Sequence, residues 1–160
     1  MSDRPVAPKS FADLIAQVTE QITGKTLDAE LAHALNRDFP AGGSWARKLQ
    51  ELCVRGCEEG WLCARAAGGI RYGRVLPAAD ATHGYSVDVV DMENVAGPHH
   101  RHPNGEIDFT MPLEGDALFD SHGAGWLVYA PDSAHRPTVS QGRALVLYLL
   151  PGGEIEFTRN

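Results

Sequence analysis

The sequence predicts a mainly β domain, an antiparallel sandwich or barrel, preceded by an N-terminal helical segment. Up to about residue 61, apolar residues recur with the helical period. After Gly60 they form short runs separated by Gly, Pro, Asn and Asp, as strands and turns do. The 17 glycines and 10 prolines make up a larger fraction of the chain than the usual combined fraction of about 12%. This excess indicates many turns.

Three helices are expected before the strands. The first carries its apolar residues on one helical face: Phe11, Leu14, Ile15, Val18 and Ile22. Ser10 is expected to cap this helix, and Gly24 to follow its last turn. A leucine stripe marks a second helix that ends before Pro40, and Ser44 is expected to cap a third. Because such stripes usually face a core, we expect residues 1–62 to pack on a barrel formed by residues 63–160.

Seven strands are expected after the helices. Their predicted ranges are 70–76, 85–92, 106–111, 117–121, 126–130, 144–150 and 154–157. The longest apolar run, residues 144–150, is far shorter than the roughly 20 residues that span a bilayer. We therefore expect it to be a buried strand.

Charge and cysteine content argue against several classes of function. The net charge of −7 disfavours a nucleic-acid partner, because phosphate binding requires clustered Lys and Arg. No apolar segment follows the start at residues 1–5, so we expect no secretory signal and a cytoplasmic location. The three cysteines lie within residues 53–63, which favours reduced thiols over a disulfide framework.

The strongest chemical signal is a cluster of histidines within residues 99–102. Residues i and i+2 of a strand face the same way, so His100 and His102 can share an interior. Turn residues at 103–105 then allow Glu106 to return to that interior, and His135 follows a later strand. Three imidazoles and a carboxylate form a mixed N/O site suited to a first-row divalent metal. The alternative is an ordinary pair of polar histidines on a strand.

Two stretches resemble the motifs of the cupin superfamily: His100-x-His102-x3-Glu106-x8-Gly115 and Gly125-x5-Pro131-x3-His135. The resemblance covers about the last hundred residues and implies a cupin-like antiparallel β-barrel, also called a double-stranded β-helix. It also implies that the four corresponding residues bind Fe, Mn, Ni or Zn. The first motif is longer than the common form. The second is one residue shorter and has Ser133 where a glycine is usual.

A narrower resemblance concerns the whole chain. Its length, its helical first third and the runs at residues 99–103 and 134–138 are similar to the para-hydroxylaminobenzoate lyases of bacterial nitroaromatic degradation. This resemblance implies an enzyme that converts an aryl hydroxylamine acid to protocatechuate and releases ammonia. The metal prediction comes from the cupin-like residues and is not carried over from the lyases.

If the substrate is a small aromatic acid, further residues become candidates for catalysis and substrate binding. Asp108 shares the face of Glu106 on a regular strand and is the candidate catalytic acid or base, with a solvent-facing carboxylate as the equal alternative. A substrate carboxylate favours an arginine, because the guanidinium fork matches two oxygens. The candidates are Arg71, Arg74, Arg101 and Arg136, of which strand alternation places Arg101 outside. Tyrosines 72, 85, 129 and 148 are further candidates for ligand contact.

Three functions are compatible with these residues. The leading prediction is a metal-dependent cupin enzyme that acts on a small aromatic carboxylate. Its most specific form is a hydroxylaminobenzoate lyase. The second is an Fe(II) dioxygenase, which would consume O₂. The third is a cupin that binds a metal and a ligand as a sensor without turnover. A homodimer is also an option, because the helices could cover a sheet edge or form a dimer contact.

Overall fold

The computed structural model describes residues 6–158, so the expectation for residues 1–5 lies outside the described range. Three helices come first: α1 (Lys9–Ile22), α2 (Ala29–Asp38) and α3 (Ser44–Glu59). A short 3-10 helix, η1 (Asp80–Thr82), follows β2. The strands are β1 (Arg65–Ala67), β2 (Ile70–Leu76), β3 (Tyr85–Ala96), β4 (His100–His102), β5 (Glu106–Phe119), β6 (Gly125–Tyr129), β7 (Ser133–His135), β8 (Thr138–Pro151) and β9 (Glu156–Phe157).

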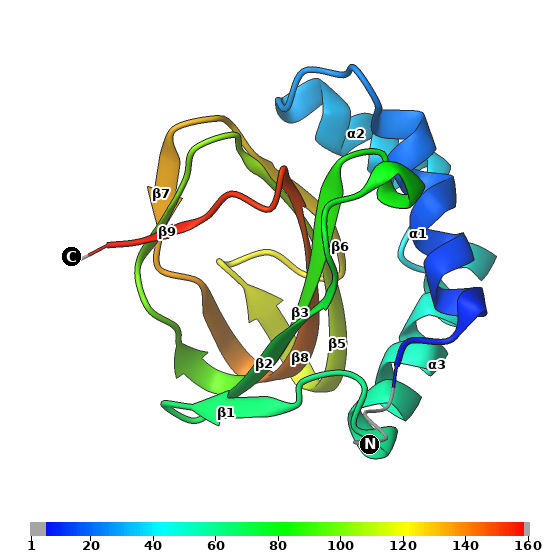
Figure 1. Cartoon of the computed structure of the whole chain (residues 1–160). Helices are drawn as coiled ribbons and strands as arrows, with labels where there is room; N and C mark the ends of the chain where they lie inside the picture. The colour runs from blue at the N-terminus through cyan, green and yellow to red at the C-terminus, as the bar shows by residue number, and fades with distance from the viewer. Residues whose placement is uncertain (1–5, 159–160) are drawn as a thin grey trace, which may run out of the picture.

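The described strands form two antiparallel sheets that lie opposite each other, with the helices on the outer side of the larger one (Figure 1). The larger sheet has the order β1-β2-β3-β8-β5-β6, and the smaller has the order β7-β4-β9. The predicted mainly β fold with an N-terminal helical segment is therefore confirmed. Within the described residues, no helix has the length and apolar character needed to cross a membrane.

The two faces of the larger sheet have different neighbours because side chains alternate along each strand. The outer face packs against the helices in one core cluster that includes Phe11, Trp45 and Phe109. The inner face belongs to a second cluster, which includes Val146 and Tyr148. Burying each of these large side chains contributes about 1.5–3 kcal/mol, which fixes the face that each strand turns inward.

Two predicted helix caps are wrong. Pro8 rather than Ser10 is the N-cap of α1, and Gly43 rather than Ser44 is the N-cap of α3; neither helix has a side-chain cap. Pro8 fits its position because its extended backbone ends the preceding segment and proline has no N–H to satisfy. Gly24 follows α1 with a φ of +74°, as expected of a residue that ends a helix.

Strand β5 joins two segments that the sequence pattern predicts as separate strands. It continues through the intervening residues because register shifts between Pro112 and Glu114, and between Gly115 and Leu118, absorb the irregular stretch. Gly115 has a φ of +68°, and a Cβ there would lie 2.6 Å from the carbonyl oxygen of Gln141. Glycine is therefore required at this bulge.

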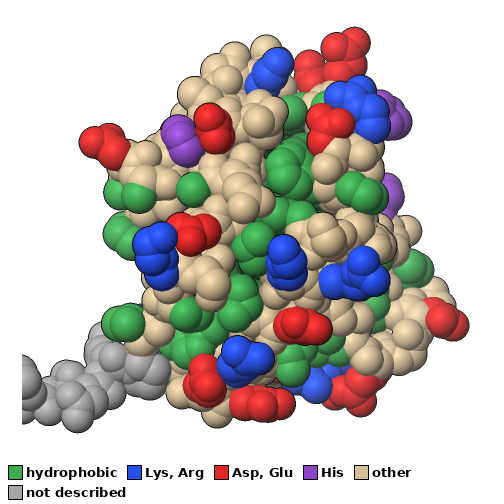
Figure 2. Space-filling model, turned by 90° about the vertical axis from the view of Figure 1, so that its right-hand side faces the viewer, with side chains coloured by type: hydrophobic (Ala, Val, Ile, Leu, Met, Phe, Trp, Pro, Cys, Tyr) green, Lys and Arg blue, Asp and Glu red, His purple; other side chains and the backbone are tan. Residues whose placement is uncertain are grey.

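The face that carries the helices is shown in Figure 2. Acidic and basic side chains are interspersed on it, and neither sign forms a continuous patch in this view. Such a mixed surface does not concentrate the positive charge that a nucleic-acid backbone requires.

Candidate metal centre

The four predicted metal ligands come from three strands and meet in the space between the two sheets. His100 and His102 lie on β4, Glu106 begins β5, and His135 ends β7. In the small sheet, His100 is directly opposite His135. His100, His102 and Glu106 are almost completely buried, and the side chain of His135 is 12% exposed. The structure therefore brings all four predicted residues together.

Strand alternation decides which histidines of this segment point inward. Arg101 lies between the two inward histidines and points outward, where its guanidinium pairs with Glu156 and Asp132. His99 forms a hydrogen bond with Thr158 and does not join the cluster. This is the arrangement that the period-two pattern predicts.

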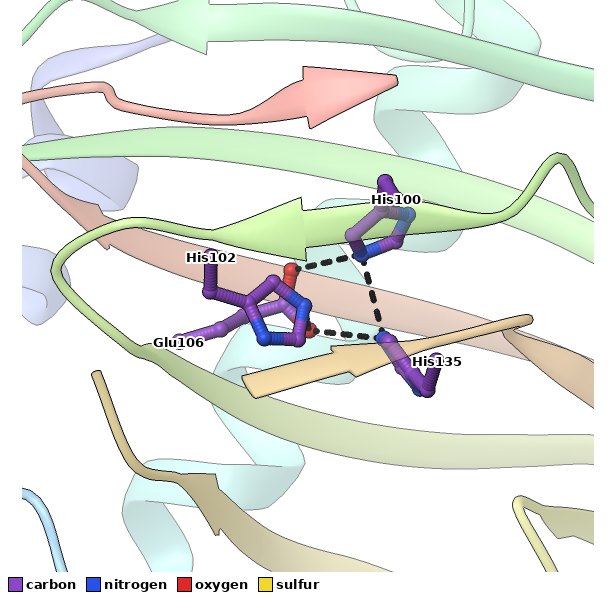
Figure 3. Close-up of side chains that lie close together, drawn as sticks. All are labelled: His100, His102, Glu106 and His135. Carbon is purple, nitrogen blue, oxygen red and sulfur yellow. Dashed lines mark hydrogen bonds and ion pairs between the residues drawn. The ribbon is translucent and has the colours of Figure 1, made fainter. Parts of the chain in front are cut away.

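The facing atoms of the four side chains are close to one another (Figure 3). The Nε2 atoms of His100 and His135 are 3.1 Å apart. Glu106 Oε1 lies 3.3 Å from His100 Nε2, and Glu106 Oε2 lies 3.3 Å from His102 Nε2 and 3.4 Å from His135 Nε2. All four potential ligand atoms lie within 4.8 Å of one another.

Two hydrogen bonds on the far side of the rings orient the imidazoles. Ser133 Oγ donates to the carbonyl oxygen of Ala130 and lies 2.9 Å from His102 Nδ1. Because the serine proton is already used, Ser133 Oγ accepts a hydrogen bond from His102 Nδ1. His135 Nδ1 lies 2.5 Å from Asp120 Oδ2 and donates to that carboxylate in the same way. Both histidines therefore direct Nε2, the atom that would bind a metal, to the centre of the cluster.

These atoms fit a metal ion in number, chemistry and spacing. Among the described residues, His102 Nε2 and both carboxylate oxygens of Glu106 are buried without a hydrogen-bond partner. Buried polar atoms without partners are costly, and a cation bound between them would remove that cost. Two ligands at about 2.1 Å from an ion and at right angles lie about 3.0 Å apart, close to the short separations within the cluster. The four side chains could therefore hold a metal ion.

The charges around the cluster favour a cation. Burial acts to raise the pKa of Glu106, but the three surrounding imidazoles hold it well below its ordinary value. Burial acts in the same direction on Asp120, and its hydrogen bonds from His135 and Tyr129 lower the pKa. Two carboxylates therefore stay ionised beside the imidazoles at neutral pH.

The model of the 4-hydroxylaminobenzoate lyase family matches residues 13–157. The chain belongs to this family. Two curated members are 28% identical to it: the 4-hydroxylaminobenzoate lyase of Pseudomonas putida, with 91% of this chain and 90% of that protein covered, and that of Nocardioides sp. (strain LMS-CY), with 94% of each covered.

Solved structures are also similar to this member of the lyase family. An RmlC-like cupin protein from Ralstonia eutropha JMP134 is 13% identical, with a TM-score of 0.45, over 61% of this chain and 64% of that chain. Oxalate oxidase in complex with the substrate analogue glycolate is 20% identical, with a TM-score of 0.42, over 58% of this chain and 57% of that chain. Each match spans less than two thirds of the solved chain.

Asp108 of this lyase-family chain lies on the inner face of β5, two residues from Glu106, as the strand pattern predicts. It is completely buried, and its carboxyl oxygens have no hydrogen-bond partner among the described residues. Burial, together with the charge of Glu106, raises its pKa well above the ordinary value. The complete burial of Asp108 makes a solvent-facing carboxylate the wrong alternative.

A cavity of about 440 Å³ leads to the cluster from the outside. His100 and Tyr148 line its inner end, and their rings are 6.4 Å apart. Asp108 is opposite Tyr148 in the sheet but is not among the residues that line this cavity. A molecule bound in this cavity therefore does not contact Asp108 in this conformation.

Asp120 and the role of Ser133 are not predicted from the sequence. Asp120 follows β5 with a φ of +48° and accepts hydrogen bonds from His135, Tyr129 and the backbone N–H of Thr138. No motif marks it, because its partners come from three later segments. Ser133, at a position where the resemblance expects glycine, is the partner of His102.

Proposed function

We propose that this chain is a 4-hydroxylaminobenzoate lyase that produces protocatechuate and ammonia. The observation that carries the proposal is the match of the family model to residues 13–157, which includes all four side chains of the cluster. The buried cluster at the end of a cavity supports it, because such a site can bind a small molecule and exclude bulk water.

The proposed reaction is balanced without an external oxidant. The N–O bond of the hydroxylamine breaks, and a C–O bond forms at the neighbouring ring carbon. Water then replaces nitrogen at the carbon that carried it, and ammonia leaves. The nitrogen gains the two electrons that the ring loses, so substrate and one water give protocatechuate and ammonia.

The cluster is the proposed site of a divalent transition metal held by His100, His102, Glu106 and His135. A bound metal would supply Lewis acidity and orient the hydroxylamino group. Asp108 is the proposed catalytic acid, because burial raises its pKa and favours the form that carries the proton. It would donate that proton to the departing hydroxyl oxygen as the N–O bond breaks. The resulting carboxylate would then accept a proton from the ring carbon as aromaticity returns.

The decisive experiment is incubation with 4-hydroxylaminobenzoate under nitrogen, with protocatechuate measured by chromatography and ammonia by an enzymatic assay. The proposal predicts both products in equal amounts without O₂. Formation of product only after air is admitted would instead support a dioxygenase. Binding of the substrate with no product in either atmosphere would support a sensor.

A variant tests the role of Asp108. Asp108→Asn is expected to lower kcat by about 10²- to 10⁴-fold, because the amide cannot donate the acidic proton. Asp116→Asn is the matched control, since Asp116 is an exposed aspartate on the same strand. Equal kcat values for the two variants would contradict the assignment of Asp108.

A further inference from the structure

The cavity beside the histidine cluster has one charged corner in an otherwise mostly apolar wall. Ile70, Val90 and Met92 contribute to the wall, and the charged pair Arg74 and Asp88 lies on the same lining. Tyr72 and Phe157 also line the cavity and are 37% and 67% exposed. An apolar space with aromatic side chains at its edge is suited to one aromatic ring.

The strand register places the charged corner at a defined distance from the cluster. Arg74 is paired with Asp88, Asp88 with Tyr148, and these residues lie on the adjacent strands β2, β3 and β8. Neighbouring strands are about 4.8 Å apart, so the backbones of Arg74 and Tyr148 are separated by about 10 Å. The ring of His100 then lies 6.4 Å from the ring of Tyr148.

A para-substituted benzoate matches this spacing. Built from bonds of about 1.3 to 1.5 Å, it spans about 6 to 7 Å from the carboxylate to the nitrogen of a para substituent. The guanidinium of Arg74 already reaches the carboxylate of Asp88, one strand away from Tyr148. Because Arg74 and His100 line the same cavity, this spacing is compatible with one aromatic ring bound between them.

Arg74 has a donor available for a second carboxylate. Its Nε donates to Asp88 Oδ1 at 2.9 Å, and its Nη2 donates to Asp88 Oδ2 at 3.4 Å and to the carbonyl oxygen of Gly153 at 3.2 Å. These bonds orient the guanidinium. They leave Nη1 without a hydrogen-bond acceptor among the described residues, so its two hydrogens can reach a ligand.

The other three candidate arginines do not line the cavity. Arg71 donates to the carbonyl oxygen of Cys57 at the end of α3, on the helical side of the sheet. Arg101 is paired with two surface carboxylates. Arg136 donates to the carbonyl oxygen of Gly97. The carboxylate-binding role thus falls to Arg74.

We propose that the cavity is an arylcarboxylate subsite in which Arg74 binds the substrate carboxylate and directs the para substituent to His100. This inference rests on the proposed function for the identity of the substrate. Arg74 thereby determines specificity: it selects aromatic acids over uncharged aromatic amines, and para substitution over shorter spans.

Equilibrium binding tests the subsite independently of turnover. The probes are 4-aminobenzoate, which lacks the reactive N–O bond, and aniline, which lacks the carboxylate, measured by calorimetry with the metal-loaded full chain. Arg74→Gln is expected to weaken 4-aminobenzoate binding about 10- to 100-fold, as loss of a hydrogen bond to a charged group does, and to leave aniline binding within twofold. Arg71→Gln, on the same strand but outside the cavity, should bind both probes as the parent does.

A second variant keeps the test valid if Arg74→Gln folds poorly because Asp88 loses its partner. The double variant Arg74→Gln with Asp88→Asn replaces the ion pair by two neutral amides, and it should show the same selective loss of 4-aminobenzoate. Equal binding of 4-aminobenzoate by the parent and either Arg74 variant would overturn the proposal. A parent that binds aniline as tightly as 4-aminobenzoate would also overturn it.

The outcome is separate from that of the lyase assay. If the parent prefers 4-aminobenzoate to aniline and the Arg74 variants do not, Arg74 binds the carboxylate. This conclusion stands even if no ammonia is formed from 4-hydroxylaminobenzoate. If ammonia is formed, Arg74→Gln should raise KM for that substrate by the same 10- to 100-fold. KM for phenylhydroxylamine, which has no carboxylate, should stay within twofold of the parent value.

Discussion

Replacement of Asp120 by asparagine should weaken metal binding although Asp120 is not itself a proposed ligand. Asp120 Oδ2 accepts the proton of His135 Nδ1 at 2.5 Å and also accepts from Tyr129, while Oδ1 accepts from the backbone N–H of Thr138 at 2.9 Å. An asparagine that keeps the bond to Thr138 presents its NH₂ group to His135. His135 then has to place its proton on Nε2, the atom that faces the cluster.

The expected loss follows from this hydrogen bond. A hydrogen bond to a charged group contributes about 1.5–3 kcal/mol, which corresponds to roughly 10- to 150-fold in affinity. Measured effects of residues that orient metal ligands are about 10- to 100-fold. We therefore expect the Zn²⁺ dissociation constant of Asp120→Asn to rise by about 10- to 100-fold.

The assay is a Zn²⁺ titration against a competing fluorescent chelator at pH 8, with the protein prepared metal-free. Asp116→Asn makes the same chemical change at an exposed position of β5 and should leave the affinity unchanged. Urea unfolding of both variants in the metal-free state separates a folding defect from a binding defect. An affinity of Asp120→Asn within twofold of the parent would refute the argument from the orientation of His135.

The remaining predictions concern the cluster, its pH dependence and the core. His100→Ala combined with His102→Ala should abolish stoichiometric metal in elemental analysis of protein purified without a histidine tag; an unchanged content would refute the ligand assignment. Metal should be lost below about pH 6, because imidazole ligands become protonated, and retention at pH 4 would contradict imidazole ligation. In the metal-free protein, burial opposes protonation of His135, but Asp120 and Glu106 outweigh it and raise its pKa to about 9. The stability that protonated His135 contributes is therefore complete below its ordinary pKa of about 6.5 and is lost as the pH rises through 9, by up to about 3 kcal/mol. Urea unfolding at pH 6.5 and 9.5 measures this loss, and equal stability at the two values would contradict it. Phe109→Ala, at a residue 1% exposed in the core, should lower the free energy of unfolding by about 3–5 kcal/mol in the same assay.

The sequence was sufficient to predict the inward residues of the cluster. Alternation on β4 assigned His100 and His102 to one side and Arg101 to the other, and the turn at residues 103–105 returned Glu106 to the same interior. These assignments depend on local geometry only. Local geometry also placed Asp108 correctly on the face of Glu106.

Features that depend on distant segments could not be predicted. Strands β4 and β7 have three residues each, too few for a periodic pattern, and they exist because they pair with each other. Asp120 acquires its partners only when β6, β7 and β8 come together around it. Arg74 could not be assigned to a face, because β2 is largely exposed and shows no alternation of apolar residues.

The cluster draws one side chain from the large sheet and three from the small one, with Glu106 on β5 and the histidines on β4 and β7. A bound ion would thus link the two sheets. The small sheet is the less stable of the two, since its strands have only two or three residues each in the described chain. Removal of the ion by a chelator should destabilise the small sheet first and leave the large sheet, which packs against the helices, folded. Faster amide hydrogen exchange confined to β4, β7 and β9 after metal removal would show this local destabilisation.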